Sequence, residues 1–333
     1  MLVINDVNFL AVRLVFSPNN RFLFAFAPDG NKCLIDLAES NVPYIPEHKV
    51  GDFRNAVFSS DSSTLFTAIG AAGFAIFDMT RDTIQEKLTP VAQDSRFAIG
   101  AILPLSPNDV LFSYGTTDNN TWIRGKKSKK GDWRFSPVSE PNLIYPAAVS
   151  PFGPERHFVA AERRLHTDSE NQVSGCSVHV VKYIMDKRSL KESETLFKYL
   201  PRKEDELSLQ LSASSDSPVL RQSILISDPK RDRHYAITML GMECADWKTG
   251  EVTTVVAAAP KSVVMAVAFS ASHDRLFYTQ QSSAVKVMSA EDYSPVNEID
   301  WGIGQVAGLT ISDDGSLAAV HGKTGKICVW DVE

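Results

Sequence analysis

The sequence predicts an all-β fold, and three observations support this prediction. One pattern recurs: an apolar strand, a serine, a polar turn of Pro, Asp, Asn or Gly, a second apolar strand, a short loop and a third strand. The copies at 14–37, 56–79, 267–290 and 309–332 align without gaps. The apolar runs have the length of strands and are too short for helices. The chain is therefore expected to consist of repeated antiparallel sheets.

The serine that opens each turn marks the copies of the repeat. Weaker copies at 104–115, 148–161 and 225–238 bring the markers to seven: Ser17, Ser59, Ser106, Ser150, Ser227, Ser270 and Ser312. Successive markers lie 42, 47, 44, 77, 43 and 42 residues apart. A period of about 40 to 45 residues is typical of four-stranded propeller blades. The sequence thus predicts a single domain over residues 1–333, a seven-bladed β-propeller of four-stranded antiparallel blades.

The long interval between the fourth and fifth markers leaves room for an eighth blade. Residues 163–175 and 201–218 are polar, however, and we interpret them as loop extensions between strands. Between them, residues 189–200 ("SLKESETLFKYL") contain helix-forming residues but follow a hairpin-like stretch. An outer strand is favoured there over a helix.

The predicted third strands are apolar on successive residues, as in "CLIDL" (33–37), "FAIFDM" (74–79) and "ICVWDV" (327–332). Such runs are typical of strands that are covered on both faces. Stacking each blade between two neighbours produces this environment.

The N-terminal residues supply a spare strand, Leu2 to Asn5, ahead of the first serine marker. The last copy of the repeat holds three predicted strands, "GLTIS", "SLAAVH" and "KICVWD". Pairing the N-terminal strand with the last blade would supply its fourth strand and cover its exposed edge. We therefore expect the propeller to be closed in this way.

Three stretches resemble known propeller families. "KTGKICVWD" (323–331) is similar to the third strand of a WD repeat, and "APDGNKCLID" (27–36) resembles the Asp-Gly loop and strand of that family. "FSPNNRFLF" (16–24) resembles the second-strand opening of WD-repeat and YVTN-type lactonase-like propellers. Trp330 and Asp331 keep the full WD ending, whereas no blade has the Gly-His pair of the family. The resemblance implies a propeller that acts as a protein-interaction scaffold.

Composition narrows the classes of partner. The chain has 44% hydrophobic and 22% charged residues, as expected for a globular protein. Its formal net charge of −6 argues against a chain-wide basic surface for nucleic acid or membrane. No secretory signal and no apolar run of about 20 residues are present in the sequence. We expect a cytoplasmic protein, with the nucleus left open, and no membrane partner.

The sequence contains none of the common motifs that indicate catalysis or cofactor binding. No Gly-rich phosphate loop, HExxH or GxSxG motif occurs, so no catalytic or cofactor-binding residue is assigned. The four cysteines lie far apart, each on a predicted third strand: Cys33, Cys176, Cys244 and Cys328. His157, His234 and His321 fall in or just after second strands without accompanying carboxylates. These residues are interpreted as buried structural residues, and no metal or cofactor is expected.

The strongest local composition is a basic loop, "TWIRGKKSKKGDWRF" (121–135). Its candidate binding residues are Trp122, Arg124, Lys126, Lys127, Lys129, Lys130, Trp133 and Arg134. Interleaved cations and aromatic rings are typical of surfaces that contact phosphate and stack on bases, or that accept an acidic peptide. The alternative is a solvated hairpin between the third and fourth strands of blade three, whose lysines deter sheet-to-sheet aggregation.

A second candidate site is the mouth of the central channel. First strands line the channel in propellers, and Arg54, Tyr145 and Arg221 lie five or six residues before their serine markers. Together they would hold an anionic group through charge-assisted hydrogen bonds. The alternative is that they are independent surface residues.

The leading hypothesis is thus a non-catalytic, WD-repeat-like scaffold for protein partners, and enzymatic activity is not favoured. One alternative is a lactonase-like propeller that hydrolyses a sugar lactone, which needs acid and base side chains clustered at the channel mouth. Another is a nucleic-acid accessory protein that uses the basic loop, the less favoured class of partner given the acidic chain.

Overall fold

The computed structural model describes residues 2–4, 7, 9, 13–27, 31–38, 43–44, 53–69, 73–80, 85–90, 98–115, 120–138, 144–151, 157–167, 173–185, 189–199, 225–228, 230–238, 241–246, 248–259 and 262–332. Within these ranges the chain forms strands and no helix. The strands assemble into seven four-stranded antiparallel sheets in the described part of the chain. The predicted all-β fold is therefore confirmed.

We number the sheets by their position along the chain. Sheet 1 contains β2 (Arg13–Phe16), β3 (Phe22–Phe26), β4 (Lys32–Asp36) and β5 (Pro43–Tyr44), and sheet 2 contains β6 (Phe53–Phe58), β7 (Thr64–Ile69), β8 (Gly73–Asp78) and β9 (Gln85–Pro90). Sheet 3 contains β10 (Ala98–Ser106), β11 (Asp109–Gly115), β12 (Asn120–Lys127) and β13 (Trp133–Pro137), and sheet 4 contains β14 (Ile144–Pro151), β15 (His157–Thr167), β16 (Val173–Met185) and β17 (Leu190–Tyr199).

Sheet 5 contains β18 (Leu225–Asp228), β19 (Arg233–Thr238), β20 (Gly241–Asp246) and β21 (Val252–Ala257), and sheet 6 contains β22 (Val264–Ser270), β23 (Arg275–Gln280), β24 (Ala284–Ser289) and β25 (Pro295–Asp300). Sheet 7 contains β26 (Val306–Ile311), β27 (Leu317–Gly322), β28 (Ile327–Asp331) and the N-terminal strand β1 (Leu2–Ile4). In sheets 1 to 6 each strand pairs with the one that precedes it in the chain.

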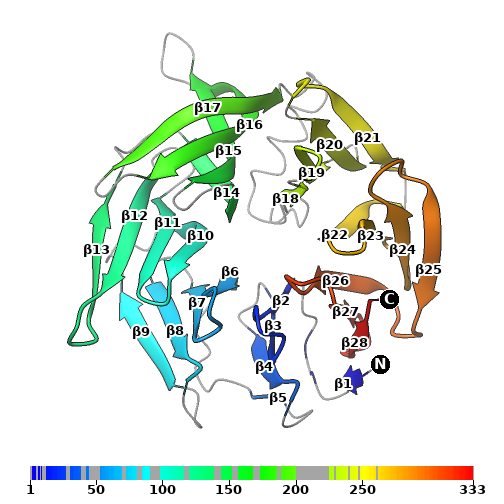
Figure 1. The fold of residues 1–333 in the computed structure, drawn as a ribbon, viewed down its shortest axis with the longest axis horizontal. Helices are drawn as coiled ribbons and strands as arrows, with labels where there is room; N and C mark the ends of the chain where they lie inside the picture. Colours follow the sequence, from blue (N-terminus) through cyan, green and yellow to red (C-terminus); the bar gives the residue numbers. More distant parts are fainter. Residues whose placement is uncertain are drawn as a thin grey trace.

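Sheet 7 joins the two ends of the described chain. β1 pairs antiparallel with β28, with Leu2 opposite Val329 and Ile4 opposite Ile327. The N-terminal and C-terminal ends therefore lie close together (Figure 1). This is the strand pairing that the spare N-terminal strand predicts.

The sheets follow one another around a common centre, with the first strand of each sheet on the inside (Figure 1). β2 contacts β6, β6 contacts β10, and the contacts continue through β14, β18 and β22 to β26. β26 in turn contacts β2. The first strands thus form a continuous series of neighbours.

Burial explains why the third strands are apolar on successive residues. In β4, Cys33 and Ile35 pack in one cluster with Ile327 of sheet 7. Leu34, which lies between them, packs in another cluster with Phe77 of sheet 2. Because successive side chains of a strand point to opposite faces, one strand needs apolar residues toward both neighbouring sheets.

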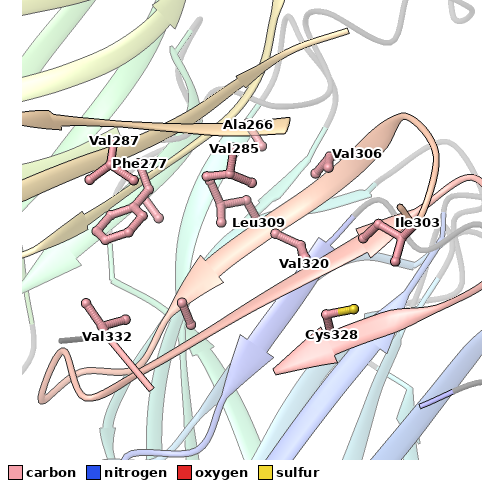
Figure 2. Packing of buried hydrophobic residues seen from close by; sticks show 12 residues of the cluster. Ala266, Phe277, Val285, Val287, Ile303, Val306, Leu309, Val320, Cys328 and Val332 are labelled. Carbon is pink, nitrogen blue, oxygen red and sulfur yellow. The ribbon is translucent and has the colours of Figure 1, made fainter. Parts of the chain in front are cut away.

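The same arrangement recurs between sheets 6 and 7 (Figure 2). Phe277 and Val285 of sheet 6 meet Leu309, Val320 and Cys328 of sheet 7 in one buried cluster. Fully burying an aliphatic or aromatic side chain contributes about 1.5 to 3 kcal/mol each, so these clusters are the main force that holds neighbouring sheets together.

The prediction of a loop extension at 163–175 is wrong for the residues of this range that the structure describes, 163–167 and 173–175. Residues 163–167 belong to β15 and residues 173–175 belong to β16, which are unusually long strands of 11 and 13 residues. Cross-strand pairing, as between His166 and Gly175, continues the ladder through a polar sequence. The sequence favours an outer strand for residues 189–200, and the structure has the strand β17 at Leu190–Tyr199. The other predicted extension, 201–218, lies outside the described residues.

Candidate functional site

The basic loop forms the hairpin between the third and fourth strands of sheet 3, as predicted. Lys126 lies opposite Arg134 and Lys127 lies opposite Trp133 on β12 and β13. The backbone N–H of Ser128 donates to the carbonyl of Asp132 at 2.7 Å and closes the turn. Gly131 has a φ of 90°, a conformation that favours glycine over residues with a Cβ atom. The sequence Ser-Lys-Lys-Gly-Asp therefore specifies a short, ordered turn.

Trp122 does not lie on the surface, so the prediction that it is a binding residue of the basic loop is wrong. Its side chain is only 3% exposed. Its ring centroid lies 5.5 Å from that of Phe158 and 6.1 Å from that of Tyr183, both in sheet 4. The indole is used to pack sheet 3 against sheet 4.

Trp133 is half-buried and packs in the opposite direction. Its ring meets the edge of Phe66 in sheet 2 at a centroid distance of 5.6 Å, and it stacks on Phe135 at 6.4 Å. The two tryptophans therefore anchor the hairpin between sheets 2 and 4. Sequence composition alone does not distinguish such anchors from a stacking surface for bases.

Arg124 is likewise part of the hairpin's base. Its Nε donates to Asp109 Oδ1 at 2.8 Å and its Nη2 donates to Oδ2 of the same carboxylate. The hydrogen bond to Asp109 raises the pKa of the Arg124 guanidinium, against the opposing effect of burial. A bidentate pair of this kind fixes the orientation of both side chains. Arg124 is therefore occupied within the protein.

Five of the predicted site residues remain as a surface, which we call the basic hairpin: Lys126, Lys127, Lys129, Lys130 and Arg134. All five side chains are exposed. Lys126 Nζ lies 3.9 Å from Asp109 Oδ2, a distance at the limit of an ion pair. The surface is thus cationic, and its base is fixed by packing and by an ion pair.

The channel-mouth candidates are not tested by the structure. Arg54 lies on β6 and Tyr145 on β14, two first strands that are separated by β10, but the described part of the structure does not include their side chains. Arg221 lies outside the described residues. A converging anion site therefore stays a prediction.

The serines that mark the repeat open the turns between first and second strands, as predicted, but sequence analysis missed the hydrogen bonds that they form. In three sheets the serine hydroxyl donates to an oxygen two residues later at 2.7 Å: Ser17 to Asn19, Ser59 to Asp61, and Ser312 to Asp314. Hydrogen bonds from the Ser316 N–H and the Ser312 hydroxyl lower the pKa of Asp314 well below its usual range. The signal was present as a recurring Ser-x-Asp or Ser-x-Asn spacing.

These turns also contact one another from sheet to sheet. The Asn19 N–H donates to Ser62 Oγ at 3.0 Å, and Asn20 Nδ2 donates to Asp314 Oδ2 at 2.8 Å. A Cβ atom on Gly315, whose φ is 76°, would lie 2.1 Å from Ser272 Oγ. The turns of sheets 6, 7, 1 and 2 are therefore packed in series.

Sheets 5 and 6 are joined by an ion-pair cluster, which also lies at the turns between first and second strands. Arg231 donates to Asp228 Oδ2 at 2.9 Å and forms two hydrogen bonds to Asp274 in the next sheet. Hydrogen bonding from Arg231 lowers the pKa of Asp274. The cluster connects turns, and its charges are matched within the protein.

Buried cysteines and histidines occupy structural positions. Cys33, Cys244 and Cys328 are buried on third strands, and burial raises the pKa of Cys33 to about 12. His234 and His321 are buried on second strands. The side chains of Cys176 and His157 lie outside the described part. Among the described residues, no group of three His, Cys, Asp or Glu side chains is placed to hold a metal ion.

His321 is expected to make stability depend on pH. Burial lowers its pKa to about 4, although the Phe9 backbone opposes this shift, and its ring lies 6.4 Å from that of Phe9. The unfolded chain, with a histidine pKa near 6.5, therefore binds more protons between about pH 6.5 and pH 4. Stability is full above pH 6.5 and falls by about 3 kcal/mol as the pH drops to 4.

Urea unfolding of the wild type and a His321→Leu variant between pH 4 and 7.5 measures this contribution. The variant should lose less stability than the wild type on acidification. Part of the acid sensitivity should persist, because burial also lowers the pKa of His234, to about 3. Parallel pH profiles for the two proteins would contradict the assignment to His321.

Comparison with known proteins adds no family: no protein-family model matches the chain, and a search of curated proteins gives no match. In the described part of the chain, no helix has the length and apolar character needed to cross a membrane.

Proposed function

We propose that the chain is a seven-bladed β-propeller closed by β1, and that it acts as a non-catalytic, WD-repeat-like scaffold for a protein partner. The seven four-stranded sheets, the series of contacts from β2 to β26 and back to β2, and the pairing of β1 with β28 support the propeller. A cytoplasmic location stays a prediction.

The basic hairpin is the observation that supports an interaction role most directly. Five exposed cations stand on a hairpin whose base is held by Trp122 and by the Arg124–Asp109 ion pair. Ordering a recognition surface before binding reduces the entropy lost on association. An ordered cationic projection on a rigid body suits recognition of another macromolecule.

Native capture of the protein tests the scaffold role. Protein recovered from its source without denaturation should elute from size exclusion in a complex with a second protein at physiological salt. Protein that repeatedly elutes alone, at the size of one chain, would contradict a scaffold role.

A further inference from the structure

The basic hairpin is positively charged, although the chain as a whole is acidic. The chain as a whole carries a formal charge of −6, yet all five of these cations are exposed on the hairpin. In the described residues of β11, β12, β13 and the turn between β12 and β13, two side chains are carboxylates: Asp109, which is bound by Arg124, and Asp132. Positive charge therefore exceeds negative charge on this exposed surface, and an anionic ligand would be attracted to it.

The cations are spread along the hairpin and do not converge on one point. Lys126 and Arg134 are cross-strand neighbours and share a face, whereas Lys127 is opposite Trp133 on the other face. Lys129 and Lys130 extend beyond both strands at the turn. A strand of five residues spans about 17 Å, so the charges match an extended anionic segment better than a single small anion.

The rings of the hairpin argue against single-stranded nucleic acid as this ligand. Proteins that bind such strands combine cations with exposed aromatic platforms on which bases stack. Trp122 is buried against Phe158 and Tyr183, and Trp133 packs on Phe66 and Phe135. The hairpin thus exposes its cations while its tryptophan rings are engaged in packing within the protein, which suits carboxylates on a polypeptide better than bases.

We infer that the basic hairpin binds an extended acidic segment of a protein partner, an inference that rests on the proposed scaffold function. Carboxylates of the segment pair with Lys126, Arg134 and the two lysines of the turn. Such pairs at the rim of an interface contribute mainly specificity and association rate, so the binding weakens as salt rises.

Peptide binding to the full chain tests this inference. The probe is a labelled peptide of about eight residues with alternating Glu and Thr, and its control carries Gln in place of each Glu. Fluorescence anisotropy should show binding of the Glu peptide at low salt, weaker binding at high salt, and no binding of the Gln peptide. Equal binding of the two peptides, or binding of neither, would overturn the inference.

Charge-reversal variants locate the binding surface. The double variant Lys130→Glu with Arg134→Glu should bind the Glu peptide about tenfold more weakly. Lys323→Glu with Lys326→Glu changes the net charge by the same amount at exposed positions of the β27–β28 turn and should bind like the wild type. Equal losses in both variants would overturn the assignment to the hairpin. Thermal unfolding verifies that each variant is folded.

A single-stranded oligothymidine of about ten nucleotides separates the two classes of partner. Tighter binding of this probe than of the Glu peptide, lost in the hairpin variant, would overturn the acidic-segment inference in favour of nucleic acid. Failure of the peptide to bind, with a native protein complex still recovered, would reject this inference alone. Failure to recover any complex would reject the scaffold.

Discussion

Replacing Ile4 with aspartate is expected to destabilise the protein strongly. Ile4 is 2% exposed on β1 and packs with Ile327 and Leu14, between sheets 7 and 1. The substitution removes the buried aliphatic side chain and places a carboxylate where it has no water, at a combined cost of about 5 kcal/mol. Domains are stable by only about 5 to 15 kcal/mol, so the thermal midpoint should fall by about 10 °C or more.

Val3 provides the matched control on the same strand. Its side chain is 37% exposed, and a Val3→Asp substitution should change the midpoint far less. Equal effects at the two positions would contradict the observed burial of β1. A Val3→Cys variant gives a second test, because position 3 lies opposite Cys328. Oxidation should join positions 3 and 328 by a disulfide, and a Cys328→Ser background should abolish it.

Replacing Phe24 with alanine is expected to weaken the packing between sheets 1 and 2 and to lower the stability of the protein. Phe24 is fully buried on β3, with its ring 5.5 Å from Phe26 and 6.2 Å from Phe77 of sheet 2. Truncation of a buried phenylalanine leaves a cavity and costs about 3 to 5 kcal/mol. Urea titration should show a lower midpoint with an unchanged slope if unfolding stays cooperative.

A Phe24→Leu variant should lose less, since leucine fills part of the same space. A Phe24→Ala protein with the midpoint of the wild type would show that packing between these two sheets contributes little to stability. That result would conflict with the clusters that join each sheet to the next.

The turn serines show where sequence prediction succeeds. A serine, a polar turn and two flanking apolar strands lie close together in the chain, and short-range hydrogen bonds such as Ser312 Oγ to Asp314 Oδ1 stabilise them. The positions of the strands, the pairing of β1 with β28 and the outer strand over 190–199 were all predictable. The exception at 163–175 arose because long strands there have a polar sequence.

The basic hairpin shows what sequence alone leaves open. Composition identified a cluster of cations and aromatic rings, but exposure depends on which neighbour each side chain faces. Trp122 faces Phe158 of sheet 4, Trp133 faces Phe66 of sheet 2, and Arg124 faces Asp109. None of these partners lies within ten residues along the chain, so local pattern carries no information about them.

The sequence by itself therefore determined the repeat, the strand character of each copy and the position of the basic turn, because these depend on neighbours in the chain. The tertiary structure alone decided which predicted site residues are buried anchors and which are exposed. Whether a side chain is buried or exposed depends on contacts between sheets, which are made by residues far apart in the sequence that pack closely together.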